Sequence, residues 1–322
     1  MAITLEASAA AASDRAVVFA CDGRYLPYAL FAAEQVARLH PARDFDICLC
    51  ALGETLDVPP ALAPLGLRVC RVGAGGALAG LPLDARRSEA TYLRLLLPGA
   101  LGGDYRRLLY LDSDVFVQGG DFGALMRVDL GARAVAAVRD NFQWRNPRRH
   151  VDSFRAMKLP NGPYFNAGVL LIDTGAFAAA GVVGRCVAFA AAHPSGMLHM
   201  DQDLLNGALI GEWAEISPRW NWQYTRATML FEAMEGAHVV HFIGAKKPWT
   251  HTGGRLPPRF RDAYRAFFAR VWPERPPLEA GPAPHRDRRY LREVLFRHTL
   301  AAGRFCDYLV RFESDLTVLN AR

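Results

Sequence analysis

Lysine, long apolar runs and a recognisable cysteine pattern are scarce or missing in this chain of 322 residues. Only Lys158, Lys246 and Lys247 are lysines among 38 cationic residues, so the adjacent pair stands out. No apolar run reaches the roughly 18 residues that span a bilayer. The alanine-rich start lacks a cationic segment and carries Glu6 and Asp14. We therefore expect neither a membrane span nor an export signal.

The six cysteines show no CxxC pair and no spacing typical of a disulfide framework; they are Cys21, Cys48, Cys50, Cys70, Cys186 and Cys306. A cysteine that lies in an apolar run behaves as a small buried hydrophobic residue. Disulfides persist in oxidising compartments and are rare in the cytosol. The sequence therefore predicts buried, reduced thiols and a cytoplasmic protein.

The net charge of +6 is unevenly distributed. Residues 1–254 contain 24 cationic and 24 acidic residues, whereas residues 255–322 contain 14 and 8. The whole surplus thus belongs to the C-terminal part. This distribution argues against a generally cationic body that coats nucleic acid, and we expect no nucleic-acid partner.

The chain is 51% hydrophobic and 22% charged, which is enough to bury a large core. Strand and helix signals alternate along it. The predicted strands are Arg15–Cys21, Phe45–Leu52, Leu67–Val72, Arg107–Leu111, Ala134–Val138, Tyr164–Asp173 and Ala237–Phe242. The predicted helices are Tyr28–His40, Ser88–Leu97 (ended by Pro98), Val182–Ala192 and Asp201–Leu209. Such alternation predicts an α/β fold with helices on both faces of a mainly parallel sheet.

We divide the chain into three parts. Residues 1–14 are expected to be a flexible N-terminus, residues 15–254 the α/β domain and residues 255–322 a basic helical region. The boundary between residues 254 and 255 follows from the proline pairs and the arginine-rich sequence that begin after Gly253. Residues 145–162 are expected to be polar and irregular.

Two carboxylates follow directly on a buried strand in the motif LLYLDSDVFV. In extended geometry Asp112 and Asp114 project to the same side, so both can bind one cation. Oxygen ligands of this kind suit Mg²⁺ or Mn²⁺ that holds a diphosphate. Asp-x-Asp alone is a weak pattern, and turn or capping aspartates are the alternative.

A second motif, HFIGAKKPW, again follows a predicted strand. His241 can supply a third ligand, and its nitrogen favours Mn²⁺. Gly244 permits close approach of the backbone to a ligand. Lys246 or Lys247 can neutralise a phosphate oxygen. A buried core histidine and a solvent-facing lysine pair are the alternative.

A third motif, MDQDLLN, opens a helix. Asp201 either caps that helix or, with its neighbours, binds sugar hydroxyl groups. In YFNAGVLL, Asn166 and Gly168 add an amide and a bare backbone at the start of a strand.

Six motifs in this order resemble the family-8 retaining glycosyltransferases, which include bacterial lipopolysaccharide galactosyl- and glucosyltransferases and glycogenin. They are FACDGRY, ATYLRLLLP, LLYLDSDVFV, FNAGVLLID, MDQDLLN and HFIGAKKPW, between about Val17 and Trp249. The resemblance implies a GT-A fold, with a Rossmann-like mixed sheet flanked by helices, and a small helical C-terminal appendage. It also implies a UDP-hexose donor and a Mn²⁺ cofactor, with Mg²⁺ as the alternative.

The resemblance assigns roles to matching residues. Asp112, Asp114 and His241 are the implied metal ligands. The implied donor-binding residues are Asp22, Tyr25, Arg94, Asp112, Ser113, Asn166, Ala167, Gly244 and Lys247, with Tyr25 stacked on uracil. Asp140, Asp201 and Gln202 are the implied catalytic residues, in the sugar pocket. Cys21, which precedes Asp22, departs from the small residue usual in the family.

Transfer of a hexose with retention requires either a nucleophile on the opposite face or attack from the face of the leaving group. The amide of Gln202 is a poor nucleophile, so we favour front-side attack with Gln202 as an orienting group. A divalent cation and basic side chains stabilise the departing diphosphate, and no strong acid is needed there.

Two other functions compete with a UDP-hexose transferase. A sugar nucleotidyltransferase should carry a Gly-rich, cationic phosphate loop near the first strand, which FACDGRYLPY is not. A non-catalytic, basic-tailed membrane or nucleic-acid adaptor has no need of the set Asp112, Asp114 and His241.

Residues 285–312 predict two short amphipathic helices separated by Gly303, each with an arginine-rich face. Such helices either lie on an anionic membrane or pack on the catalytic domain. The resemblance favours the membrane, because related bacterial enzymes act on lipid-linked acceptors. The expected acceptor is a saccharide, with lipid linkage as one form of it.

Overall fold

A computed structural model describes residues 3–82, 89–250, 256–279 and 287–321. A nine-stranded sheet crosses the molecule in the order β1-β4-β3-β2-β5-β8-β7-β9-β12. Neighbours from β4 to β5 are parallel, β8 is antiparallel to β5 and β7, and β1 and β12 are antiparallel edge strands. The strands are β1 (Thr4–Ala7), β2 (Arg15–Ala20), β3 (Asp46–Leu52), β4 (Arg68–Gly73), β5 (Arg107–Leu111), β7 (Val135–Arg139), β8 (Phe165–Asp173), β9 (Ala214–Ile216) and β12 (Val318–Asn320).

A second sheet of three strands stands beside the C-terminal end of β5. Its order is β10 (Trp222–Gln223), β11 (Val239–His241) and β6 (Val115–Val117). Strand β11 pairs antiparallel with β6, so that His241 lies opposite Val115. This pairing brings two motifs that are far apart in sequence to one place.

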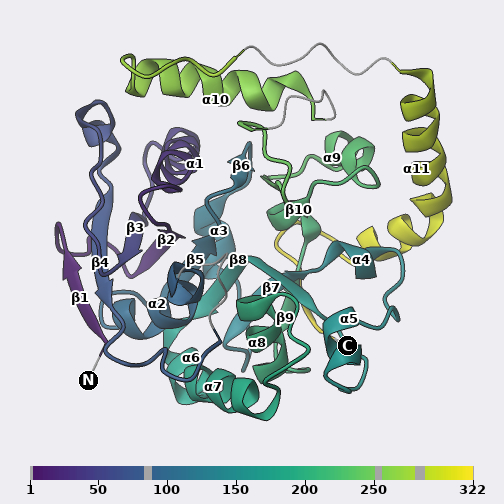
Figure 1. Cartoon of the computed structure of the whole chain (residues 1–322), viewed down its shortest axis with the longest axis horizontal. Helices are drawn as coiled ribbons and strands as arrows, with labels where there is room; N and C mark the ends of the chain where they lie inside the picture. The colour runs from purple at the N-terminus through teal and green to yellow at the C-terminus, as the bar shows by residue number, and fades with distance from the viewer. Residues whose placement is uncertain (1–2, 83–88, 251–255, 280–286, 322) are drawn as a thin grey trace.

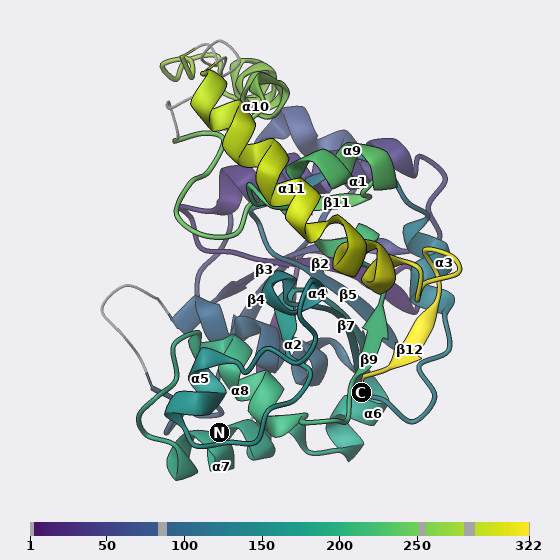
Figure 2. The ribbon, with the colours of Figure 1, turned by 90° about the vertical axis from the view of Figure 1, so that its right-hand side faces the viewer.

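Helices cover both faces of the large sheet (Figures 1 and 2). They are α1 (Leu26–Leu39), α2 (Leu93–Leu101), α3 (Phe122–Arg127), α4 (Asn141–Trp144), α5 (Asp152–Ala156), α6 (Thr174–Ala179), α7 (Val182–Ala192), α8 (Met200–Ala208), α9 (Met229–Glu235), α10 (Pro258–Val271) and α11 (Arg288–Leu309). Three 3-10 helices complete the described part: η1 (Pro60–Leu65), η2 (Glu89–Tyr92) and η3 (Pro218–Asn221).

Alternation along the strands divides the interior into two cores. On β2, Val17 and Phe19 face the core under α1, α3 and α10, whereas Ala16 and Val18 face the core under α2, α7 and α8. Successive side chains of a strand point to opposite faces, and both faces of this sheet are covered. The predicted α/β fold, a mixed sheet flanked by helices, is therefore confirmed.

The seven predicted strands are present with bounds within two residues of those expected. The predicted end of the second helix at Pro98 is wrong, because α2 continues to Leu101 with Pro98 inside it. Proline removes one backbone hydrogen bond. The fully buried side chains of Leu95 and Leu96 before Pro98, and of Leu101 after it, hold this helix in the core.

The segment expected to be a flexible N-terminus, residues 1–14, contains a strand. Thr4–Ala7 forms β1, which pairs with β4. Without β1, the backbone groups along that side of β4 would form an exposed edge. The segment expected to be irregular, residues 145–162, also contains the short helix α5.

The C-terminal region differs from the expected pair of short helices, because α11 runs unbroken through Gly303. Its buried face consists of Val294, His298, Ala301, Phe305 and Tyr308, and it packs against α4. Strand β12 then joins the large sheet beside β9. The expected boundary between residues 254 and 255, like residues 285–286, lies outside the described residues.

The prediction of buried, reduced thiols is confirmed at every cysteine but one. All six cysteines are free, and five are buried, but Cys306 on α11 is exposed. Burial raises the pKa of the Cys21 thiol to about 12. In the described part of the chain, every helix is too short or too polar to cross a bilayer.

Candidate metal and nucleotide-sugar site

Strand β5 delivers the Asp-x-Asp motif to the carboxyl end of the parallel strands. The backbone N–H of Asp112 donates to the carbonyl of Gly168 (2.8 Å), and the hydroxyl of Ser113 donates to the carbonyl of Ala20 (3.3 Å). These bonds fix the turn between β5 and β6. Ligands of open α/β sheets bind at this edge.

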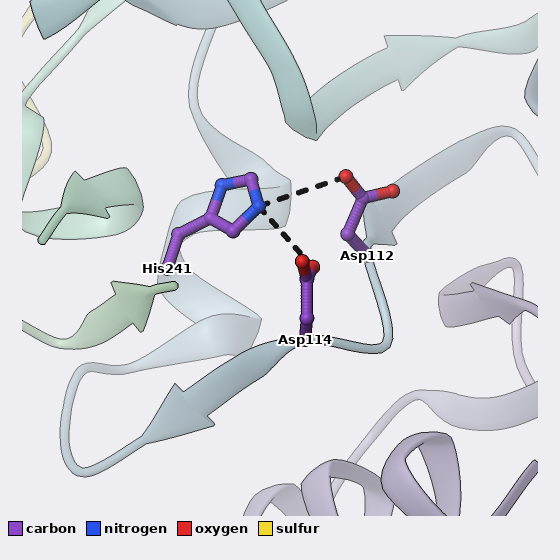
Figure 3. Close-up of side chains that lie close together, drawn as sticks. All are labelled: Asp112, Asp114 and His241. Atoms are coloured by element: carbon purple, nitrogen blue, oxygen red, sulfur yellow. Dashed lines mark ion pairs between the residues drawn. The ribbon is translucent and has the colours of Figure 1, made fainter. Parts of the chain in front are cut away.

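The imidazole of His241 points at both carboxylates (Figure 3). Its Nε2 lies 3.2 Å from Oδ1 of Asp114 and 3.8 Å from Oδ2 of Asp112. One ligand atom from each of the three side chains lies within 4.8 Å of the others. Two carboxylate oxygens and one nitrogen are a donor set that suits Mn²⁺.

Asn221 fixes which nitrogen of His241 faces the carboxylates. The fully buried Asn221 places its Oδ1 3.0 Å from Nδ1 of His241, and its Nδ2 donates to Asn166 (2.9 Å). An amide oxygen only accepts, so Nδ1 carries a hydrogen. In the neutral ring, Nε2 then presents its lone pair to two carboxylates. A divalent cation between these groups satisfies all three, so the residues fit a metal.

Gly168 of β8 leaves the space that the candidate metal ligands Asp112 and His241 occupy. A Cβ at this position would lie 2.2 Å from Cε1 of His241 and 2.9 Å from Oδ2 of Asp112. Only glycine permits this approach. The sequence suggested a bare backbone at the entrance of the strand, and the structure places it in β8 against the ligands.

Arg94, from α2, connects the metal site with the next part of the cleft. Its guanidinium bonds Oδ1 of Asp112 (2.9 Å) and the carbonyl of Ala167 (2.6 Å), and its Nε lies 2.9 Å from Oδ2 of Asp201. Burial disfavours its charge, but Asp112 and Asp201 together raise the pKa of Arg94. The sequence left open whether Asp201 caps helix α8. The N-cap of α8 is His199, and Asp201 pairs with Arg94 instead.

Of the two adjacent lysines, Lys247 is the one that enters the site. Its Nζ contacts Oδ2 of Asp114 and the carbonyl of Phe242, whereas Lys246 is exposed. Burial opposes the charge of Asp114, but His241 and Lys247 outweigh it and lower the pKa of that carboxyl. Gly244 has φ +79°, a conformation that a side chain would strain.

A chain of amide groups links the metal site to Gln202 of α8. Oε1 of Gln202 accepts from Nδ2 of Asn166 (3.2 Å) and from the backbone of Ala167 (3.0 Å). Its Nε2 donates to Oδ2 of Asp140 (3.4 Å). Burial raises the pKa of Asp140, and the hydrogen bonds that it accepts oppose that rise. Asp140 also caps α4.

Two aromatic residues mark the outer part of the site. The ring of Tyr25 is 42% exposed and stands edge-on to Tyr28 at 5.8 Å. Tyr28 in turn stacks on Trp249 with 3.8 Å between ring centroids. Asp22 accepts from the backbone of Tyr25 (3.0 Å) and so holds this turn at the start of α1.

Most of the predicted residues line one cleft of about 660 Å³. Ala167 is the exception among the predicted residues, since it does not line the cleft and acts only through its backbone. The predicted residues that line it are Asp22, Tyr25, Arg94, Asp112, Ser113, Asp114, Asp140, Asn166, Asp201, Gln202, His241, Gly244 and Lys247. The structure therefore brings together residues spread over more than two hundred positions of the sequence.

The sequence analysis missed several residues of the cleft: Arg24, Thr91, Tyr110, Phe142, His199 and Ile243. Tyr110 had a signal, since it precedes Asp112 by two positions and so shares its face. Its hydroxyl donates to Oδ1 of Asp112 (2.6 Å), and burial raises its pKa. No sequence signal could have identified Asn221, because its role depends on how η3 packs against β11.

Comparison with known proteins places this geometry in a family. A sequence model of glycosyl transferase family 8 matches residues 16–253. General stress protein A of Bacillus subtilis is 31% identical over 199 residues, which are 56% of this chain and 65% of that protein. Lipopolysaccharide 1,2-glucosyltransferase of Escherichia coli is 29% identical over 178 residues, which are 52% of each chain. The chain thus spans about half to two thirds of the length of these relatives.

A solved structure supports the same relationship. The galactosyltransferase LgtC, in complex with donor and acceptor sugar analogues, superposes with a TM-score of 0.65 at 27% identity. The match covers 78% of this chain and 95% of that one. The expected GT-A fold is thereby confirmed. On the extent of the sequence match and the shared fold, the chain belongs to glycosyl transferase family 8.

Proposed function

We propose that this protein is a Mn²⁺-dependent retaining glycosyltransferase that moves galactose or glucose from a UDP donor to a saccharide acceptor. The observation that carries the proposal is the convergence of Asp112, Asp114 and His241 within 4.8 Å inside the cleft. The relatives named as hexosyltransferases and the likeness to LgtC support it.

The donor's nucleotide and diphosphate have suitable partners at one end of the cleft. The exposed ring of Tyr25 offers a face on which a base can stack. When bound by Asp112, Asp114 and His241, the cation supplies Lewis-acid stabilisation of the diphosphate. Lys247 adds a positive charge there, and Gly244 lets the backbone approach without a side chain.

The sugar end of the cleft contains Gln202, Asp140 and Asn166. Oε1 of Gln202 already accepts two hydrogen bonds, which makes it still less nucleophilic than an ordinary amide. We therefore favour front-side attack. The acceptor oxygen forms its bond to the anomeric carbon as the bond to UDP breaks, and the hydroxyl proton passes to the departing diphosphate. Gln202 and Asp140 orient the hexose.

The acceptor is inferred to be lipid-linked, and the enzyme to work at the cytoplasmic face of a membrane. Helix α11 carries an outward apolar patch, defined here as Leu295, Phe296 and Leu300, each more than half exposed. Exposed arginines at its N-terminal end complement anionic headgroups. The opposite face of α11 packs on the domain, which leaves the apolar patch available for a membrane.

Hydrolysis of UDP-galactose and UDP-glucose tests the proposed function. We expect turnover that depends on Mn²⁺ and disappears after chelation. Asp112→Asn should lower turnover by at least about 100-fold, because it removes a ligand charge at the diphosphate. Asp57→Asn, at an exposed site, is the matched control. Equal turnover of the Asp112 variant, or turnover without a divalent cation, contradicts the proposal.

A further inference from the structure

The segment after α4 carries three arginines that have no counter-charge of their own. Arg145, Arg148 and Arg149, together called the arginine rim, form no ion pair with a carboxylate in the described ranges. The next helix shows the contrast, since Arg155 pairs with Asp152 at 3.4 Å. Three unpaired cations within five positions concentrate positive potential on one surface.

The backbone that presents the arginine rim is fixed by buried groups. Nε2 of the fully buried Gln143 donates to the carbonyls of Arg149 (3.1 Å) and Gly162 (3.0 Å). The carbonyl of Arg148 accepts from Nδ2 of Asn161 (2.8 Å). A segment held in this way loses little conformational entropy when a ligand binds.

The arginine rim borders the sugar end of the cleft. The guanidinium carbon of Arg149 lies 5.4 Å from the ring centroid of Phe142, and Phe142 lines the cleft together with Asp140. Helix α4, which directly precedes the rim, packs against α11 (Figure 1). Burial lowers the pKa of Arg145, and the like charges of Arg297 and Arg149 lower it further. An anion here would relieve that repulsion.

We propose that the arginine rim binds a phosphate group carried by the acceptor saccharide. This inference rests on the proposed function, since it assigns the chemical class of the acceptor. The donor's diphosphate has Lys247 and the metal ligands as partners at the other end of the cleft, so the rim is available for a second anion. Guanidinium groups bind phosphate through paired, charge-assisted hydrogen bonds.

Binding of glucose 6-phosphate and glucose, followed by NMR, tests the inference. The protein is first saturated with UDP and Mn²⁺, so that phosphate does not occupy the donor site. We expect glucose 6-phosphate to bind at least about 10-fold more tightly than glucose, which is the value of one charge-assisted contact. The double variant Arg148→Gln/Arg149→Gln should lose that difference. Arg265→Gln, an exposed arginine on α10, should keep it.

Three results overturn the inference: no binding of glucose 6-phosphate, equal binding of both sugars, or unchanged binding by the double variant. A parallel sedimentation assay uses phosphatidylglycerol vesicles. If the double variant loses only vesicle binding, the rim recognises lipid headgroups and the inference also fails. Saturation with UDP is measured separately, so a failure of the donor site is distinguished from a failure of the rim.

Discussion

Single residues set the geometry of the metal site, and two of them contact no substrate in the proposed mechanism. Asn221 determines the tautomer of His241 through one hydrogen bond of 3.0 Å. Gly168 determines how closely the ligands approach β8. Asn221 excludes the tautomer of His241 in which Nε2 carries the hydrogen. Gly168 prevents the displacement of the imidazole that a side chain at this position would cause.

Gly168→Ala tests this view. The added methyl group would overlap His241 and Asp112, so we expect Mn²⁺ affinity and turnover to fall by about 10- to 100-fold. Affinity is measured by electron paramagnetic resonance of free Mn²⁺. Gly184→Ala is the control, because nothing lies within 4 Å of the Cβ position there. Unchanged affinity of the Gly168 variant would show that the ligands can shift without loss.

Among the elements, α11 differs most from its prediction. Gly303 was expected to separate two helices, but it lies inside one helix of 22 residues. Glycine disfavours a helix by only about 1 kcal/mol relative to alanine. Burial of Phe305 and Tyr308 on the far side of Gly303 outweighs that cost. The continuous helix then presents its apolar patch outward.

Replacement of this patch tests membrane contact. In Leu295→Ser/Phe296→Ser/Leu300→Ser the exposed apolar area is removed while the buried face remains. We expect sedimentation with phosphatidylglycerol vesicles to fall by about 10-fold or more, since each apolar side chain contributes through its buried area. Hydrolysis of UDP-hexose should stay unchanged. Undiminished sedimentation would exclude α11 as the contact.

At the scale of the molecule, the C-terminal region is anchored to the large sheet by one buried carboxylate. Glu215 of β9 is fully buried and forms an ion pair with Arg139 (2.7 Å). It also bonds Tyr308 (2.9 Å) and Arg311 (3.0 Å), next to β12. Arg139 directly precedes Asp140 of the cleft. The same carboxylate therefore joins the catalytic sheet and the C-terminal region.

Glu215→Ala should destabilise the whole chain by about 3–5 kcal/mol, because it removes the buried carboxylate that pairs with the buried charge of Arg139. Denaturant unfolding measures this loss. Glu212→Ala is the control, since that exposed glutamate pairs with Arg185 on the surface. A loss below about 1 kcal/mol would show that water or another group replaces the carboxylate.

Much of the fold and the site was predictable, and the failures share a cause. Asp112, Asp114 and His241 were predicted because they lie at the end of a strongly apolar strand or directly beyond one. Asn221 and Phe142 were missed because their neighbours in the sequence carry no periodic signal. Strand β1 was missed because Thr4–Ala7 is short and its pairing partner β4 lies more than sixty residues away.

The sequence by itself determined the local chemistry: which segments are strands, which carboxylates share a face, and which motifs recur in the family. Those features depend on neighbours along the chain, where periodicity and order are visible. Only the tertiary structure decided that Asn221 orients His241, that Asp201 pairs with Arg94, and that the basic tail joins the sheet. These outcomes depend on contacts between segments far apart in sequence, whose distances no local pattern records.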